Sequence, residues 1–173
     1  MNIQSGWRYR GEEDKAPLHY TDCGLDDVFL LSGYRVTDTP YGSGVSIKDV
    51  DQLHEAIGCS LAGKKKVLSG KELRFLRKHM DVTQSELGKL VGLSSQQVAR
   101  WEKGESVISG PADLLVRALF IQHVGGHLNL RDLANSLEEL DAPLNDRICF
   151  ENTAAGWEVR AAAHSALCDR VMA

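Results

Sequence analysis

The 173-residue sequence lacks an apolar run near the roughly 20 residues that a membrane-spanning helix needs. Its first segment, "MNIQSGWRYRGEEDK", has no apolar core of the kind found in secretory signals. We therefore expect a cytoplasmic protein that does not bind a membrane. A hydrophobic share of 43% and a charged share of 25% are typical of a globular chain of one domain or two small ones.

Paired cysteines are also missing. The four cysteines are Cys23, Cys59, Cys149 and Cys168, and no two form a C-x-x-C pair. This scatter excludes a zinc ribbon and a disulfide framework, so we expect free thiols. His123 and His127 are four residues apart, but Gly125 and Gly126 between them favour a helix end or a surface role over a metal site. Because no G-x-S-x-G, phosphate-loop or H-E-x-x-H motif occurs, we expect neither an enzyme nor a cofactor.

Basic charge is concentrated in one segment of an acidic chain. The net charge of the chain is -4, yet residues 64–103 contain ten lysines and arginines against four acidic residues, a net charge of +6. The rest of the chain therefore carries a net charge of -10. Such a segment indicates a nucleic-acid-binding module. Charge alone leaves a solvated helix surface as the alternative.

The first third of the chain predicts an arm followed by a small α+β unit. Residues 1–17 are polar, which favours a flexible arm. Residues 18–41 contain a β-prone run, "VFLLSGY", among glycines and a proline that favour turns. Residues 46–63 place apolar side chains three or four positions apart, which predicts an amphipathic helix. We take residues 18–63 as this unit and "GKKK" as a polar linker.

Capping signals predict four helices within residues 67–125. The signals are Ser69 with Glu72, Thr83 with Glu86, Ser94 and Pro111. A fifth helix is predicted from Asn129. Residues 126–173 form a C-terminal extension in which "RICFENTAAGWEVRA" has two β-prone runs that favour a hairpin. The overlapping "RAAAHSALCDRV" is equally compatible with a helix.

Two of these helices meet at a glycine corner. Leu87, Leu90 and Val91 form an apolar stripe on the first helix, and Val98 and Trp101 do so on the second, with Leu93 just before it. These side chains can be buried together if the helices cross steeply. Gly92 would adopt the left-handed backbone of the turn, and Gly88 would allow close approach. The pattern predicts a helix-turn-helix whose second helix lies in the major groove.

With Val98 and Trp101 turned inward, the opposite face of the second helix is polar. The candidate base contacts on it are Ser95, Gln96, Gln97, Ala99 and Arg100. Glutamine can bond adenine through two hydrogen bonds, arginine can do so with guanine, and an alanine methyl can contact a thymine methyl. The candidate phosphate contacts are Thr83, Gln84, Lys89, Lys103, Lys64, Lys65 and Lys66. A helical pair whose polar face meets only water is the alternative.

The stretch "LRFLRKHMDVTQSELGKLVGLSSQQVARWEKG", continuing into "LLVRALF", resembles the helix-turn-helix of the phage-repressor (Cro-like, XRE) family. The likeness covers about 50 of the 173 residues. It implies that Gln84 holds a phosphate while Ser95, Gln96 and Arg100 contact bases. Two departures are Gly88, where the family favours alanine, and a long loop over residues 105–110.

The N-terminal third resembles, in layout, the MqsA/YgiT-type antitoxin-like regulators. The matching segments are "HYTDCGLDDVFLLSGYRV" and "VSIKDVDQLHEAIG", followed by the repressor-type stretch. That family binds zinc through two C-x-x-C pairs. Here only Cys23 has the matching "CG" context, and His19, Asp22 and His54 do not complete a tetrahedral set. We interpret the unit as a degenerate version that folds without metal.

Together these patterns predict a mainly α protein. A repressor-like DNA-binding domain of the five-helix type, with its helix-turn-helix part at residues 67–125, would follow the α+β unit and precede the C-terminal extension. We expect a sequence-specific transcriptional regulator that binds double-stranded DNA as a homodimer and represses from a palindromic operator. The C-terminal extension is one candidate for the dimer surface, and the N-terminal unit is the other. The rival hypothesis is an antitoxin-type protein that binds a toxin through its N-terminal unit and autoregulates its promoter.

Overall fold

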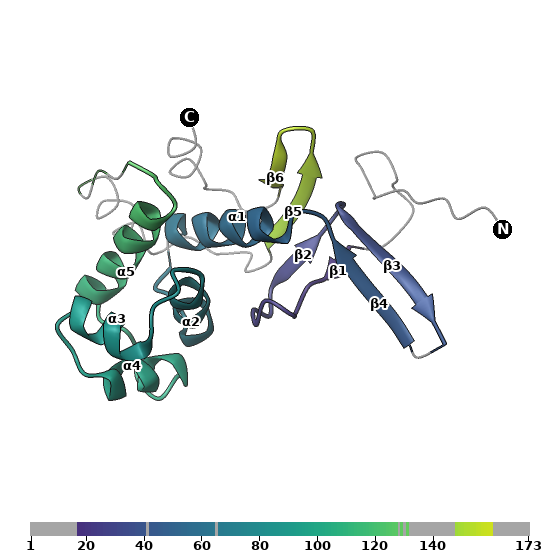
Figure 1. Ribbon diagram of the computed structural model, residues 1–173. Helices are drawn as coiled ribbons and strands as arrows, with labels where there is room; N and C mark the ends of the chain where they lie inside the picture. Colours follow the sequence, from purple (N-terminus) through teal and green to yellow (C-terminus); the bar gives the residue numbers. More distant parts are fainter. Residues whose placement is uncertain are drawn as a thin grey trace.

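The computed structural model describes residues 17–40, 42–64, 66–127, 129, 131 and 148–160. Within these residues the chain forms two small sheets and five helices. The strands gather at one end of the molecule and helices α2 to α5 at the other, with α1 between them (Figure 1). A helix-rich part with a strand-containing N-terminal region was predicted. The helix predicted from Asn129 lies largely outside the described residues.

The larger sheet combines strands from both ends of the chain. It has the order β1-β2-β5-β6, and the strands are β1 (Leu18–His19), β2 (Val28–Leu30), β5 (Ile148–Thr153) and β6 (Gly156–Val159). Strands β5 and β6 are antiparallel, so the predicted C-terminal hairpin is confirmed. Strand β5 runs parallel to β2, with Val28 opposite Ile148. The hairpin therefore completes the sheet of the N-terminal unit, a pairing that the sequence did not indicate.

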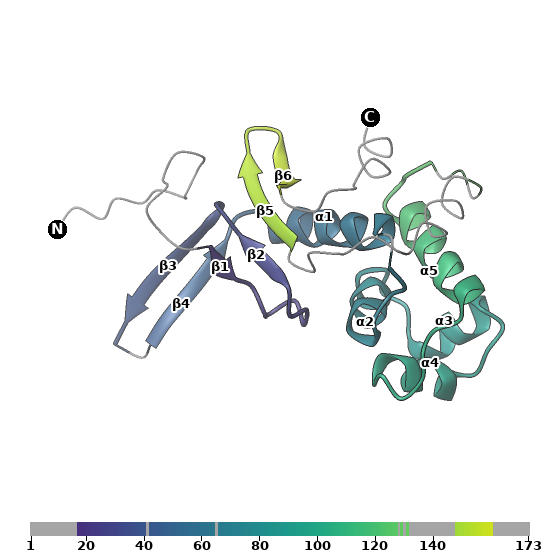
Figure 2. The ribbon, with the colours of Figure 1, turned by 180° about the vertical axis from the view of Figure 1, so that it is seen from behind.

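The second sheet is a ribbon of two antiparallel strands, β3 (Tyr34–Thr39) and β4 (Gly42–Ile47). Figures 1 and 2 show the ribbon extending away from the larger sheet and the helices. Val36 lies opposite Val45, and these side chains are 52% and 45% exposed. A cross-strand apolar pair therefore lies outside the core.

Helix α1 (Val50–Gly63) connects the strands to the remaining helices. It begins at Val50 and not at the predicted Ser46, because Ile47 and its neighbours belong to β4. All residues from position 56 to its end are buried, since α1 contacts α2, α5 and β6. Gly58 faces the ring of Phe120 at a distance that leaves no room for a Cβ atom. Glycine at this position therefore allows α1 and α5 to pack closely.

The other helices are α2 (Gly70–His79), α3 (Gln84–Leu90), α4 (Ser95–Glu102) and α5 (Gly110–His123). Both predicted capping boxes are confirmed. At α2, the Ser69 side chain accepts from the backbone N–H of Glu72, whose carboxylate accepts from Ser69 N at 2.6 Å. At α3, Thr83 and Glu86 make the same exchange. These short sequence patterns determine where α2 and α3 begin.

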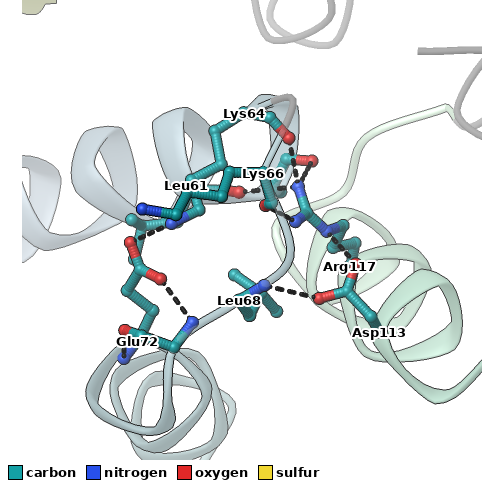
Figure 3. Close-up of polar contacts among 9 residues, drawn as sticks. Leu61, Lys64, Lys66, Leu68, Glu72, Asp113 and Arg117 are labelled. Carbon is teal, nitrogen blue, oxygen red and sulfur yellow. Dashed lines mark hydrogen bonds and ion pairs between the residues drawn. The ribbon is translucent and has the colours of Figure 1, made fainter. Parts of the chain in front are cut away.

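A buried arginine holds the α1–α2 linker against α5 (Figure 3). The Nε atom of Arg117 donates to Asp113 Oδ2 at 2.8 Å, and both side chains are almost completely buried. The guanidinium also donates to the backbone carbonyls of Leu61, Ala62, Lys64 and Lys66. Asp113 Oδ1 accepts from Leu68 N at 2.9 Å. Arg117 thus binds backbone carbonyls of the last turn of α1 and of the linker that follows it.

Candidate nucleic-acid interface

Helices α3 and α4 meet at a tight corner. Gly92 has φ of +71°, the left-handed conformation predicted for it. Leu93 N donates to the carbonyl of Gly88 at 2.7 Å, and a Cβ built on Gly88 would lie 2.7 Å from Leu93 O. The backbone of the corner therefore rests directly on α3. Ser94 then caps α4, because its hydroxyl accepts from Gln97 N at 3.2 Å.

Helix α4 has one buried and one exposed face. Val98 is fully buried and Trp101 is 4% exposed, whereas Ser95, Gln96 and Arg100 are all exposed. The predicted inward direction of the two apolar side chains is thus confirmed. The three polar side chains point away from the protein and are available to a ligand.

The other two candidate base contacts are less accessible. Ala99 and Gln97 are both half-buried. The Nε2 atom of Gln97 donates to Ser106 Oγ at 3.0 Å, which ties α4 to the loop that follows it. Gln97 therefore has a role within the protein that the sequence did not indicate.

Leu90 and Leu93 differ from the expected burial. Leu90 is 52% exposed and Leu93 is 42% exposed, so the prediction that both pack into the corner was wrong. On α3, Leu87, Gly88 and Val91 form the inward arc. Leu90 lies outside this arc, because each residue turns the helix by about 100°. Two apolar side chains are left on the surface beside α4.

A buried carboxylate holds α2, α3 and α4 together. Glu102, at the end of α4, accepts from Arg77 Nε at 2.5 Å and from Gln84 Nε2 at 2.8 Å. Arg77 also donates to the carbonyl of Val82 at 2.7 Å. The sequence indicated only the charges of Arg77 and Glu102, although Glu102 directly follows Trp101 in "RWEKG". This network fixes the position of α4 relative to the other two helices.

The candidate phosphate contacts occupy different environments. Lys66, Lys89 and Lys103 are exposed. Lys64 is half-buried and forms an ion pair with Glu72. Lys65 lies outside the described residues. The amide of Gln84 uses one of its two N–H groups for Glu102 and retains the other.

The start of α3 carries a stabilised carboxylate. The backbone N–H and the hydroxyl of Thr83 lower the pKa of Glu86, so this exposed side chain stays ionised at neutral pH. A negative charge in the first turn stabilises the helix. It also reduces the attraction of this helix end for a phosphate group.

The predicted weak metal candidates of the N-terminal unit have other contacts. Cys23 Sγ donates to the carbonyl of Tyr20 at 3.3 Å, and His54 Nε2 lies 2.9 Å from Tyr20 Oη. His19 Nε2 contacts the carbonyl of Asp26. In the part of the chain that the structure describes, no group of three or more His, Cys, Asp or Glu side chains could hold a metal ion.

Comparison with protein families agrees with this geometry. Residues 73–112 match a family model described as helix-turn-helix, and the match runs from α2 to the start of α5. These residues form a helix-turn-helix domain. The chain therefore carries a DNA-binding domain of the kind found in transcription regulators, in agreement with the XRE-type resemblance. The match covers less than a quarter of the chain.

Comparison with curated proteins and with solved structures gave no match. The resemblance of the N-terminal third to the MqsA/YgiT type therefore stays a prediction. Among the described helices, none has both the length and the apolar character that crossing a bilayer requires.

Proposed function

We propose that this protein is a sequence-specific DNA-binding transcriptional regulator that inserts α4 into the major groove. One observation carries the proposal: Val98 and Trp101 are buried, while Ser95, Gln96 and Arg100 are exposed on the same short helix. A helix held by its apolar face presents its polar face to a ligand. In a helix-turn-helix, that ligand is the edge of the base pairs.

The exposed side chains suit two kinds of contact. Gln96 and Arg100 can each form paired hydrogen bonds, with adenine and guanine respectively, and Ser95 can donate or accept. Lys89 and Lys103, which are exposed near α4, are suited to phosphates. Lys64 would have to exchange Glu72 for a phosphate, so its contribution is expected to be smaller.

We also propose that the protein acts as a homodimeric repressor on a palindromic operator. One short helix contacts only a few base pairs, and a two-fold symmetric dimer doubles the length of DNA that is recognised. Within the described larger sheet, β6 is an edge strand. This strand is our candidate within the C-terminal extension for the contact between subunits.

Selection from a pool of random DNA duplexes tests both proposals. We expect enrichment of a palindrome whose half-sites are about 10 base pairs apart, with a size in solution of two chains per duplex. We further expect affinity to fall steeply between low and high salt, because bound lysines and arginines release counterions from the phosphates. Recovery of random sequence after several rounds would contradict base-specific binding.

An antitoxin-type function is a second candidate. The observation that favours it is the β3–β4 ribbon, which extends from the N-terminal unit with the apolar Val36–Val45 pair exposed. An isolated two-stranded ribbon is only marginally stable in water, so a protein partner would stabilise it. Purification from the native source distinguishes the candidates: a lone homodimer favours the regulator, and a stoichiometric complex with a second small protein favours the antitoxin.

A further inference from the structure

Two exposed leucines flank Gly92 at the corner before α4. Leu90 is the last residue of α3, and Leu93 immediately precedes the capping residue Ser94. Their exposed fractions, 52% and 42%, leave about half of each side chain in water. We refer to Leu90 and Leu93 as the corner leucines.

Close backbone packing fixes the position of Leu93. Its N–H donates to the carbonyl of Gly88 at 2.7 Å, and its own carbonyl oxygen lies 2.7 Å from the position that a Cβ of Gly88 would take. The corner thus rests on α3 with no space between them for a side chain. The side chain of Leu93 is therefore turned outward by the fold, and the hydrogen bond of Ser94 to Gln97 N holds the next residue in place.

The corner leucines adjoin the part of α4 that would enter DNA. The residues at the start of a recognition helix are those that meet base edges, and here Ser95 and Gln96 are both exposed. Exposed leucine gains free energy when an apolar group covers it. In the major groove the apolar group on a base edge is the C5-methyl of thymine.

We infer that Leu93, assisted by Leu90 from the other side of Gly92, contacts thymine methyl groups and makes the protein prefer thymine at one position of each half-site. The inference rests on the proposed DNA-binding function and adds a specificity determinant outside α4. It requires no hydrogen bond, so the preference depends on the methyl group and not on the pairing of the base.

Replacement of thymine by deoxyuridine isolates this contact, because only the C5-methyl is removed. The probe is the duplex enriched by selection, with each thymine of one half-site replaced in turn. At one position we expect wild-type affinity to fall about fourfold, the effect of one buried methyl group. In the Leu93→Ala variant we expect the thymine and deoxyuridine duplexes to bind equally at that position.

Two further variants complete the test. Val36→Ala removes an equally exposed apolar side chain from the remote ribbon and should retain the full thymine preference. Leu90→Ala should reduce the preference in part. Circular dichroism melting checks that each variant is folded, which is expected because the substituted side chains are exposed.

The outcomes separate this inference from the proposed function. The inference is overturned, while DNA binding stands, if no deoxyuridine replacement changes affinity. It is also overturned if Leu93→Ala and Leu90→Ala both keep the wild-type ratio of affinities for the thymine and deoxyuridine duplexes. A methyl effect that persists in these variants assigns the contact to another residue, such as Ala99. If selection enriches no sequence at all, the proposed function and this inference both fall.

Discussion

At the scale of single residues, the buried ion pair of Arg117 and Asp113 has many hydrogen bonds that offset its burial. Arg117 is completely buried, and its guanidinium binds one carboxylate and four carbonyl oxygens. Removing a charged group from water costs several kcal/mol, and only complete hydrogen bonding offsets that cost. The same contacts join residues 61–68 to α5, so the pair also positions the domain relative to α1.

Replacement of one member of this pair should be costly. Arg117→Met keeps the apolar stem but leaves Asp113 and the linker carbonyls without their partner. We expect the free energy of unfolding to fall by about 3–5 kcal/mol, measured by chemical denaturation. The matched control is Arg74→Met, since Arg74 is exposed on α2 and should change stability by less than about 0.5 kcal/mol. Similar stabilities for the two variants would show that the buried network is unimportant.

At the scale of elements, the corner between α3 and α4 explains why glycine stands at position 88. A Cβ there would lie within 3.2 Å of three backbone atoms of residues 93–95. Backbone cannot move aside as a flexible side chain can. The family to which this stretch has a resemblance favours alanine at this position, so the corner of this protein is packed more tightly than that pattern implies.

We predict that Gly88→Ala destabilises the protein. The gain of about 1 kcal/mol in helix propensity is outweighed by overpacking, for a net loss of about 1–2 kcal/mol. The control is Gly110→Ala at the start of α5, where a Cβ would meet nothing within 4 Å. Thermal melting of both variants is the measurement. A Gly88→Ala protein as stable as wild type would mean that the corner opens easily.

The sequence predicted those elements whose determinants are local. Ser69 with Glu72 and Thr83 with Glu86 lie three residues apart, and both capping boxes are confirmed. The corner at Gly92 and the inward direction of Val98 and Trp101 followed from helical periodicity in the same way. These features together define the exposed face of α4.

Features that depend on distant residues could not be predicted. The pairing of β2 with β5 joins segments at the two ends of the chain, and no short pattern encodes such a partner. The contacts of Arg117 are with backbone carbonyls of residues 61–66, whose location depends on how α1 ends. The burial of Leu90 was predicted wrongly. The spacing of apolar residues in the sequence does not show which side chains at the edge of the apolar face of a short helix are buried.

At the scale of the whole molecule, a row of aromatic rings crosses the junction of α1, α2 and α5. His54 lies against Phe75, which lies against His79, and His79 contacts both Phe120 and His123. Burial lowers the pKa of His54 and of His79, and the neighbouring histidine lowers each further, although Asp51 opposes the shift at both and Glu55 at His79.

A protonated tyrosine hydroxyl lies beside His54. Burial, with Cys23 and Asp22 nearby, raises the pKa of Tyr20 to about 12, so its hydroxyl keeps its proton. That hydroxyl lies 2.9 Å from His54 Nε2, within hydrogen-bond distance, and which of the two atoms donates depends on the imidazole tautomer.

Stability should therefore depend on pH below neutrality. The folded state binds protons on His54 and His79 less readily than the unfolded state, whose histidines titrate near 6.5. The free energy of unfolding should change little between about pH 7.5 and 8 and fall as the pH drops through 6.5. Denaturation series at several pH values measure this. His79→Gln should reduce the dependence of the free energy of unfolding on pH. The control is His127→Gln, which should leave this dependence unchanged because His127 is exposed.

The distribution of charge over the molecule suits a protein that binds DNA with one part only. Residues 64–103 carry a net charge of +6 within a chain of net charge -4. Attraction to phosphates is thereby concentrated on the helix-turn-helix, while the acidic remainder is repelled by DNA. Orientation on the duplex is thus favoured before any base is contacted.

The central claim is that the exposed face of α4 contacts bases. Its most direct test is a binding titration of two variants. Each variant is titrated against the selected duplex and its single-base variants, at several salt concentrations. We predict that Arg100→Ala loses about 1–3 kcal/mol on the selected duplex and its preference at one base position. Lys103→Ala should instead weaken binding to all duplexes alike and reduce the salt slope by about one. Indistinguishable behaviour of the two variants would contradict the account.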